Sequence, residues 1–248
     1  MSEPAIVARN LAVGYDGAAV LRDVNFEVRT GEVFAILGGS GSGKTTLLRA
    51  LIGLLPPLEG RLEIFGQDLA SAAPDARARI LREMGVLFQT GALLADLTLA
   101  ENVMLPILAH TDLPESTARL LACIKLAQVG LCGDEDLLPS QISGGMRKRA
   151  GIARAMALDP RILILDEPSS GLDPPTAADL DRLIRALNRH LGITVVMVTH
   201  DLASTLTVAQ RCILIDREVR GIRAEGEPGF LRDRHPDPVV RAFFRRAA

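Results

Sequence analysis

The chain has 248 residues, 48% of them hydrophobic, so it is long enough to bury a sizeable core in one large α/β domain, alone or with a subdomain. Its formal net charge of −2 gives no reason to expect nucleic acid or an anionic lipid surface as the main ligand. No stretch reaches the roughly 18 apolar residues that a membrane-spanning helix needs, and the three cysteines lack metal-ligand spacing.

The N-terminal part of the chain predicts short strands followed by a helix. Residues 5–37 are expected to form strands with turns, and residues 24–28 alternate between apolar and polar as a half-exposed strand does. Tyr15, the only tyrosine, lies in a turn between strands, where its ring either stacks on an adenine base or simply packs. Residues 33–37 are continuously apolar, which favours a buried parallel strand, and a helix is expected over residues 44–55.

The segment between this strand and this helix is a phosphate-binding loop. It reads Gly-Gly-Ser-Gly-Ser-Gly-Lys-Thr and matches the pattern G-x-x-x-x-G-K-[ST]. Its glycines let consecutive backbone N–H groups turn toward a phosphate, Lys44 pairs with phosphate oxygens, and the Thr45 hydroxyl binds Mg²⁺. The phosphates of ATP are therefore expected to contact Gly38, Gly39, Ser40, Gly41, Ser42, Gly43, Lys44, Thr45 and Thr46.

A more helical stretch follows at about residues 90–155, and we interpret it as an insertion into a nucleotide-binding α/β core. Gln89 precedes it. Its amide can contact Mg²⁺ or an attacking water, or it is an ordinary amide at the end of a strand. The basic residues 147–149 are expected to form a solvated helix face and not a nucleic-acid site, because few charges cluster there and no aromatic residues interleave.

Ser143 begins a helix expected to continue through Ala157, and the start of this helix predicts a second anion site. Ser143 is a favourable N-cap, and the small residues Gly144 and Gly145 let a phosphate approach closely. One fold needs only one nucleotide cradle. We therefore expect ATP to be shared between two copies of the chain.

Two carboxylates follow the apolar residues 162–165, which are expected to form a buried strand. Ligands collect at the carboxyl ends of parallel strands, so Asp166 can hold Mg²⁺ and Glu167 can accept a proton from an attacking water. The alternative is a pair of acids that only solvates the end of a strand.

His200 follows the next apolar strand, residues 193–198, so it is expected on the same side of the sheet as Asp166. There its imidazole can bond the γ-phosphate or the attacking water, although a lone histidine at a strand end is usually a surface residue. Asp173, before two prolines, is expected to cap a helix over residues 174–191 and to reach across a dimer interface.

Taken in order, these motifs resemble the nucleotide-binding subunit of ABC transporters over nearly the whole chain. The family signature usually reads Leu-Ser-Gly-Gly-Gln, whereas this chain has Ile142 and Met146 at the two ends. The resemblance implies that ATP and Mg²⁺ are the cofactors, that Thr45, Gln89 and Asp166 hold the metal, and that Glu167, His200 and Gln89 act in hydrolysis. The other residues that carry the resemblance are Tyr15, the phosphate-binding loop, Ser143, Gly144, Gly145 and Asp173.

The same resemblance implies one ABC ATPase domain over residues 1–248. Its expected fold class is α/β, with a P-loop NTPase (RecA-like) core of mostly parallel strands and an N-terminal antiparallel β subdomain. A helical signature subdomain is expected at about residues 90–155 and a C-terminal tail at about residues 226–248.

Segments within residues 87–103 and 143–160 are also similar to the ATPase subunit of Mce-type phospholipid transporters, which include the bacterial (Mla) system that maintains lipid asymmetry of the outer membrane. This implies a homodimer on the cytoplasmic side of the inner membrane, beneath an integral-membrane permease. A periplasmic Mce-domain protein belongs to such complexes, as does a STAS-domain protein in some systems. Apolar residues 90–105 are then expected to be partly core and partly a groove for a permease helix.

Three other functions are alternatives to this one. They are an importer ATPase for a small substrate such as an amino acid or a metal, a soluble ABC ATPase acting on DNA or the ribosome, and a small-molecule P-loop kinase. The chain has no second cassette, coiled coil or basic extension of the kind that soluble ABC proteins carry. The second anion site argues against a kinase.

Overall fold

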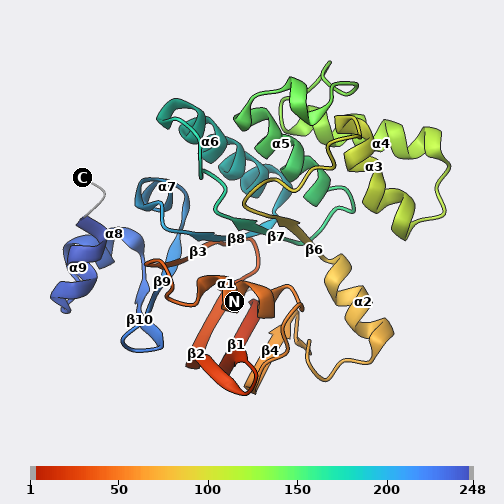
Figure 1. Ribbon diagram of the computed structural model, residues 1–248. Helices are drawn as coiled ribbons and strands as arrows, with labels where there is room; N and C mark the ends of the chain where they lie inside the picture. The colour runs from red at the N-terminus through yellow and green to blue at the C-terminus, as the bar shows by residue number, and fades with distance from the viewer. Residues whose placement is uncertain (1–3, 246–248) are drawn as a thin grey trace.

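A six-stranded sheet lies at the centre of the structure, a computed structural model that describes residues 4–245 (Figure 1). The strand order is β10-β9-β3-β8-β7-β6, and all neighbours are parallel except β10 and β9. Layers cover both faces of the sheet, so its central strands are continuous apolar runs. The strands are β3 (Val33–Gly38), β6 (Met84–Leu87), β7 (Ile162–Asp166), β8 (Thr194–Thr199), β9 (Arg211–Asp216) and β10 (Gly221–Gly226).

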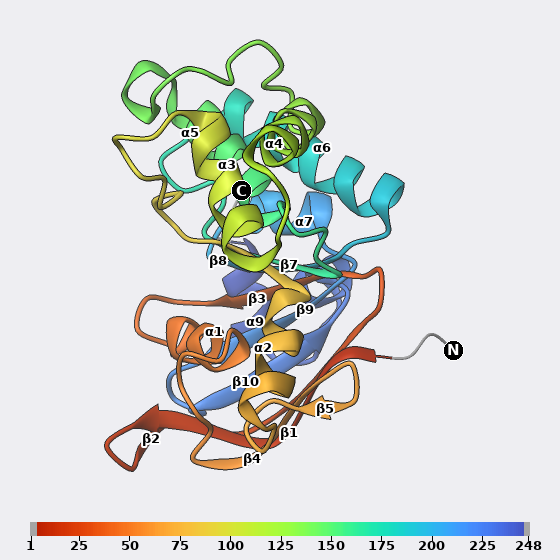
Figure 2. The ribbon, with the colours of Figure 1, turned by 90° about the vertical axis from the view of Figure 1, so that its right-hand side faces the viewer.

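Helix α1 (Lys44–Leu51) lies between the large sheet and a second, antiparallel sheet of order β2-β1-β4-β5, as Figures 1 and 2 show. Buried leucines of α1 share one core with apolar residues of both sheets. The helix ends four residues before the predicted end at residue 55, because Gly53 turns the chain at φ 73°. The strands of this sheet are β1 (Pro4–Tyr15), β2 (Ala18–Arg29), β4 (Glu59–Ile64) and β5 (Gln67–Asp68).

Helices cover the other face of the large sheet and share a second core with it (Figure 1). Most of them lie between β6 and β7, where the sequence indicated a helical insertion. Ser143 and Asp173 are the N-caps of α5 and α6, as predicted, with side chains that accept hydrogen bonds from Met146 N and Thr176 N. These helices are α3 (Leu99–His110), α4 (Glu115–Gln128), the short 3-10 helix η1 (Pro139–Gln141), α5 (Gly144–Ala155) and α6 (Pro174–Leu191).

Helix α2 (Pro74–Arg82) precedes β6. Three further helices follow β8 and complete the fold. They are α7 (Leu202–Val208), α8 (Pro228–Asp233) and α9 (Pro238–Arg245). In the segment expected as a C-terminal tail, α8 and α9 pack through Leu231, Val240 and Phe244 against the large sheet. The last three residues of that segment lie outside the described part. Within residues 4–245, no helix combines the length and the apolar character needed to cross a bilayer.

Asn102 of α3 fixes the loop that leads from Gln89 into the helical layer. The side chain is fully buried, and its Oδ1 accepts from Leu94 N at 2.8 Å. Its Nδ2 lies 3.1 Å from Leu94 O, 3.0 Å from Leu97 O and 3.0 Å from Thr98 O. One buried amide therefore bonds main-chain groups of the loop and of the helix start, where Leu94 O and Thr98 O also accept from Leu97 N and Asn102 N.

We expect Asn102→Ala to lower the free energy of unfolding by about 1–3 kcal/mol, because it leaves Leu94 N without its acceptor and Leu97 O without its donor. Urea titration of the isolated chain measures the change. Asn25→Ala serves as a control at an exposed amide and is expected to have the smaller effect. Equal effects of the two substitutions would contradict the role of Asn102.

Candidate functional site

The phosphate-binding loop connects β3 to α1. Gly41 and Gly43 have φ of 72° and 105°, a region that residues with a Cβ rarely adopt. Gly43 is the N-cap of α1 and provides no side-chain hydrogen bond, so the first N–H groups of the helix are left for an anion. A Cβ on Gly43 would also lie 2.9 Å from the Leu21 side chain. Glycine is therefore required here both for conformation and for space.

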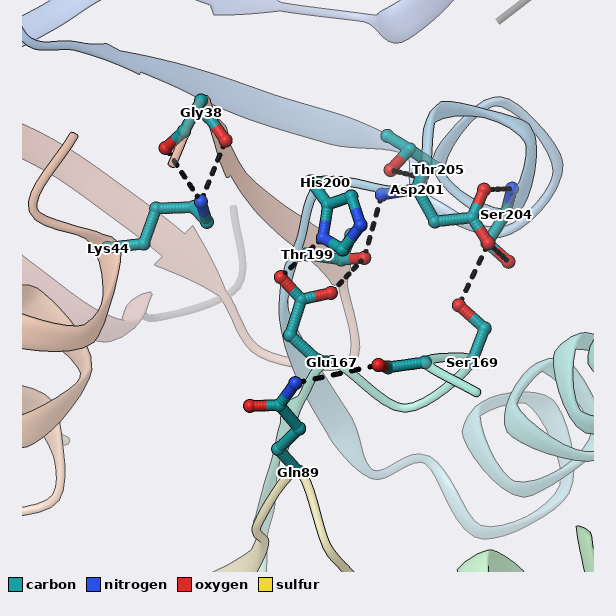
Figure 3. A network of polar contacts seen from close by, with 12 residues as sticks. Gly38, Lys44, Gln89, Glu167, Ser169, Thr199, His200, Asp201, Ser204 and Thr205 are labelled. Atoms are coloured by element: carbon teal, nitrogen blue, oxygen red, sulfur yellow. Dashed lines mark hydrogen bonds and ion pairs between the residues drawn. The ribbon is translucent and has the colours of Figure 1, made fainter. Parts of the chain in front are cut away.

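Lys44 lies over this loop. Its Nζ donates to Gly38 O at 2.7 Å and to Gly39 O at 3.1 Å (Figure 3). Burial lowers the pKa of Lys44, while the nearby carboxylates of Glu167 and Asp166 act in the opposite direction. The cation thus stands between the glycine loop and two carboxylates, where a phosphate group has both amide and ammonium donors within reach.

A cavity of about 920 Å³ extends from the loop to the ends of β6, β7 and β8. This volume falls in the range of small-molecule sites. Three residues predicted for the loop do not line it: Ser42 and Thr46 are buried, and Gly43 lies at the helix cap. The predicted residues that do line it are Gly38, Gly39, Ser40, Gly41, Lys44, Thr45, Gln89, Asp166, Glu167 and His200.

Glu167 presents its carboxylate to the cavity in a fixed orientation. Thr199 Oγ1 donates to Oε2 at 3.1 Å, and His200 Nδ1 lies 2.8 Å from Oε1 (Figure 3). The Glu167 side chain is only 13% exposed, whereas that of His200 is 68% exposed. The Glu167 backbone has φ 46°, in the left-handed region, and strain of this kind concentrates at functional sites.

Asp166 lies beside Glu167 at the end of β7. Burial raises the pKa of Asp166 and the charge of Glu167 raises it further, while Lys148 and Lys44 lower it. Two carboxylates this close, partly withdrawn from water, favour the approach of a cation.

Gln89 follows β6 and faces the same cavity. Its Nε2 lies 3.5 Å from Ser170 Oγ, at the limit of a hydrogen bond (Figure 3). The amide is therefore held only weakly in this orientation.

Five predicted site residues lie away from the cavity wall. Ser143, Gly144 and Gly145 stand at the start of α5, and Asp173 at the start of α6. Tyr15 ends β1, is 40% exposed, and accepts a hydrogen bond from Arg49. A single chain therefore does not bring the two anion sites together.

The sequence reasoning missed several residues of the cavity. Asp201 is the N-cap of α7, with Oδ1 accepting from Ser204 N at 3.1 Å and Oδ2 from Ser169 Oγ at 2.8 Å (Figure 3). The spacing of Asp201 and Ser204 is a readable N-cap signal. Phe243 of α9 also lines the cavity, and no local pattern indicates that.

The basic residues 147–149 do not form the solvated face that the sequence suggested. Lys148 is only 6% exposed, and Arg149 Nη1 donates to Val129 O at 2.9 Å. Arg147 is exposed, yet its Nη1 donates to Ile142 O at 2.7 Å. The expectation was wrong because all three cations turn back to main-chain carbonyls.

A glycine loop with a lysine, next to strand ends that carry two carboxylates, defines a P-loop nucleotide-hydrolysing protein. The sequence profile of the family described as ABC transporter matches residues 21–170. The chain belongs to this family, and it binds ATP and hydrolyses it in connection with transport. The expected resemblance is thereby confirmed.

Two relatives are similar over most of the chain. The intermembrane phospholipid transport system ATP-binding protein MlaF of Haemophilus influenzae is 39% identical over 215 residues, 87% of this chain and 81% of that protein. The probable ribonucleotide transport ATP-binding protein mkl of Mycobacterium leprae is 40% identical over 239 residues, 96% of this chain and 68% of that protein.

Solved structures confirm the expected fold. MJ0796, a bacterial ABC transporter cassette solved as a dimer, gives a TM-score of 0.80 at 31% identity, over 90% of this chain and 98% of that one. The cbiO1 protein from Clostridium perfringens gives a TM-score of 0.84 at 26% identity, over 92% of this chain and 90% of that one.

Proposed function

We propose that the chain is the ATPase subunit of an Mla-type transporter and energises phospholipid movement between bacterial membranes. The observation that carries the ATPase part is the Glu167 carboxylate, held by Thr199 and His200 at the wall of the cavity that Lys44 also lines. Glu167 accepts a proton from the attacking water, and His200 keeps the carboxylate oriented toward it. Lys44 and the loop amides stabilise the charge on the phosphates.

The oxygen donors that line the cavity fit Mg²⁺. Thr45, Gln89 and Asp166 line the same cavity and offer oxygen ligands, which Mg²⁺ prefers together with waters and substrate phosphates. Mg²⁺, when bound, neutralises charge on the phosphate oxygens. Asp166 supplies the carboxylate. Burial and Glu167 raise the pKa of Asp166, and a bound cation would lower it again.

The active form proposed is a homodimer with two shared sites. Ser143 caps α5 outside the cavity of its own chain, so its helix start is available to the nucleotide of a second copy. Asp173 is exposed at the start of α6, so it is available for a contact between the two copies. The dimeric cassette structure at 31% identity supports this arrangement. Tyr15 then remains the proposed adenine-stacking residue.

Phospholipid is the proposed cargo because the chain is similar to MlaF and because segments within residues 87–103 and 143–160 resemble the ATPase of Mce-type transporters. The subunit then works on the cytoplasmic side of the inner membrane with an integral-membrane permease, a periplasmic Mce-domain protein and, in some systems, a STAS-domain protein. Reconstitution of the copurified permease complex in liposomes tests the cargo, with ATP-dependent transfer of labelled phospholipid as the supporting result. The mkl relative is named as a probable ribonucleotide transport protein. Transfer of a ribonucleotide in place of phospholipid would therefore contradict the proposal.

Leu94 is the proposed contact with a permease helix, since its side chain is 50% exposed while Leu99 and Val103 are core. We expect Leu94→Asp to fold and to hydrolyse ATP but to lose permease copurification and lipid transfer, because an unpaired buried carboxylate costs several kcal/mol as an order of magnitude. Leu99→Asp, at a fully buried position, is the matched control and should unfold. Normal assembly of Leu94→Asp with the permease would reject this contact.

A further inference from the structure

Lys148 of α5 is a buried cation that touches the backbone at two of the proposed site residues. Its side chain Nζ donates to Gln89 O at 2.6 Å and to Glu167 O at 3.0 Å. Burial lowers the pKa of Lys148, and the charges of Asp166 and Glu167 raise it. A lysine is rarely this buried unless its charge is paired, and the acceptors of Lys148 are these two carbonyls.

Helix α5 holds the chain after Gln89 at further points. Arg154 Nη2 donates to Gly91 O at 3.0 Å and its Nη1 to Ala92 O at 2.7 Å. A Cβ on Gly151 would lie 3.2 Å from Gly91 O, so the helix and this loop pack closely. The loop and α5 are therefore expected to move together. Of the hydrogen bonds that Lys148 and Arg154 donate, the one from Lys148 to Glu167 O connects α5 to the residue that follows β7.

The other end of this link is the strained backbone of Glu167. Its N donates to Val198 O at 2.8 Å, and its carbonyl accepts from Ser170 N at 3.2 Å and from Lys148. At φ 46° a non-glycine residue keeps its conformation only when its surroundings impose it. A donor on the carbonyl is one such constraint on the backbone from which the Glu167 side chain extends.

We propose that Lys148 is a positioning residue for hydrolysis, which clamps the main-chain carbonyls of Gln89 and Glu167 and so ties the orientation of Glu167 to the position of α5. The proposal rests on the functions proposed above for Glu167 and Ser143. Ser143 and Lys148 are five residues apart at one end of the same helix, about one and a half turns. A displacement of Ser143 by the nucleotide of the second copy therefore moves the clamp on Glu167 in its own copy.

The test is Lys148→Met, which keeps an apolar side chain of similar length and removes the donors. We expect kcat for ATP hydrolysis to fall by about 10–100-fold, because a small misplacement of a catalytic group is enough for such a loss. The dissociation constant for ATP is expected to stay within about twofold, since the phosphate-binding loop is untouched. Lys148→Arg keeps a charged donor and is expected to remain within about threefold of the unchanged chain.

Lys125 provides a matched control. It is 5% exposed on α4, pairs with Asp159 and does not line the cavity. Lys125→Met removes a buried ammonium from the same helical layer, so it reports any general loss of stability. We expect it to leave kcat nearly unchanged. If Lys148→Met does not fold, Lys148→Gln and Lys125→Gln are compared in its place, with the same expected order.

The outcomes separate this proposal from the proposed function. A Lys148→Met chain with the kcat of Lys125→Met would overturn the positioning role, and so would a loss of kcat that Lys148→Arg does not recover. Glu167→Gln is measured in parallel. If it hydrolyses ATP at the unchanged rate, the general-base assignment fails; if it is inactive while Lys148→Met is active, only the positioning proposal fails.

Discussion

Glu167→Gln is expected to bind ATP with nearly unchanged affinity and to lose turnover by about 10²–10⁴-fold, the usual contribution of a general base. The amide has almost the same shape as the carboxylate, so it still fits between Thr199 and His200. It cannot accept a proton from water. The chemical step is therefore blocked while the contacts of the phosphate-binding loop remain.

Phosphate release measures the turnover, and size-exclusion chromatography with ATP measures assembly. We expect the substituted chain to accumulate as a closed dimer that retains two nucleotides, because closure no longer ends in hydrolysis. Glu218→Gln is the control, since the Glu218 side chain is 88% exposed and does not line the cavity. Hydrolysis near the unchanged rate in Glu167→Gln would remove Glu167 from the proposed mechanism.

The sequence predicted the parts of this site that lie at the ends of buried strands. A continuous apolar run can only be a buried strand or helix, and parallel strands end at the same edge of a sheet. That rule, together with the phosphate-binding loop, predicted Asp166, Glu167 and His200 at one site, and the structure puts all three in one cavity with Lys44.

Long-range contacts of charged side chains were not predictable in the same way. Lys148 stands in a basic run that reads as solvated, yet its partners are backbone oxygens 59 and 19 residues away. Backbone acceptors are present at every residue, so no residue type marks them in a sequence. The helix end at Leu51 was missed for a different reason. The residues up to 55 stay apolar, and the glycine that ends the helix lies inside that run.

The shared site predicts an unusual result for two inactive chains mixed together. Lys44→Ala removes the ammonium that lies over the phosphate-binding loop, so it is expected to weaken nucleotide binding as well as hydrolysis. Ser143→Arg replaces the N-cap of α5 with a bulky cation. It is expected to leave ATP binding to the isolated chain nearly intact and to block closure of the dimer, because Ser143 does not line the cavity of its own chain.

In a heterodimer of the two, one site carries both lesions and the other carries neither, because each site takes Lys44 from one copy and Ser143 from the other. Heterodimers isolated through two different affinity tags are therefore expected to recover up to about half of the unchanged activity if the sites act independently. Each homodimer stays inactive under the same conditions and serves as the control. If the chain hydrolyses ATP at the full rate as a monomer, or if Ser143→Arg alone is fully active, the sites are not shared and the nucleotide is processed within one copy.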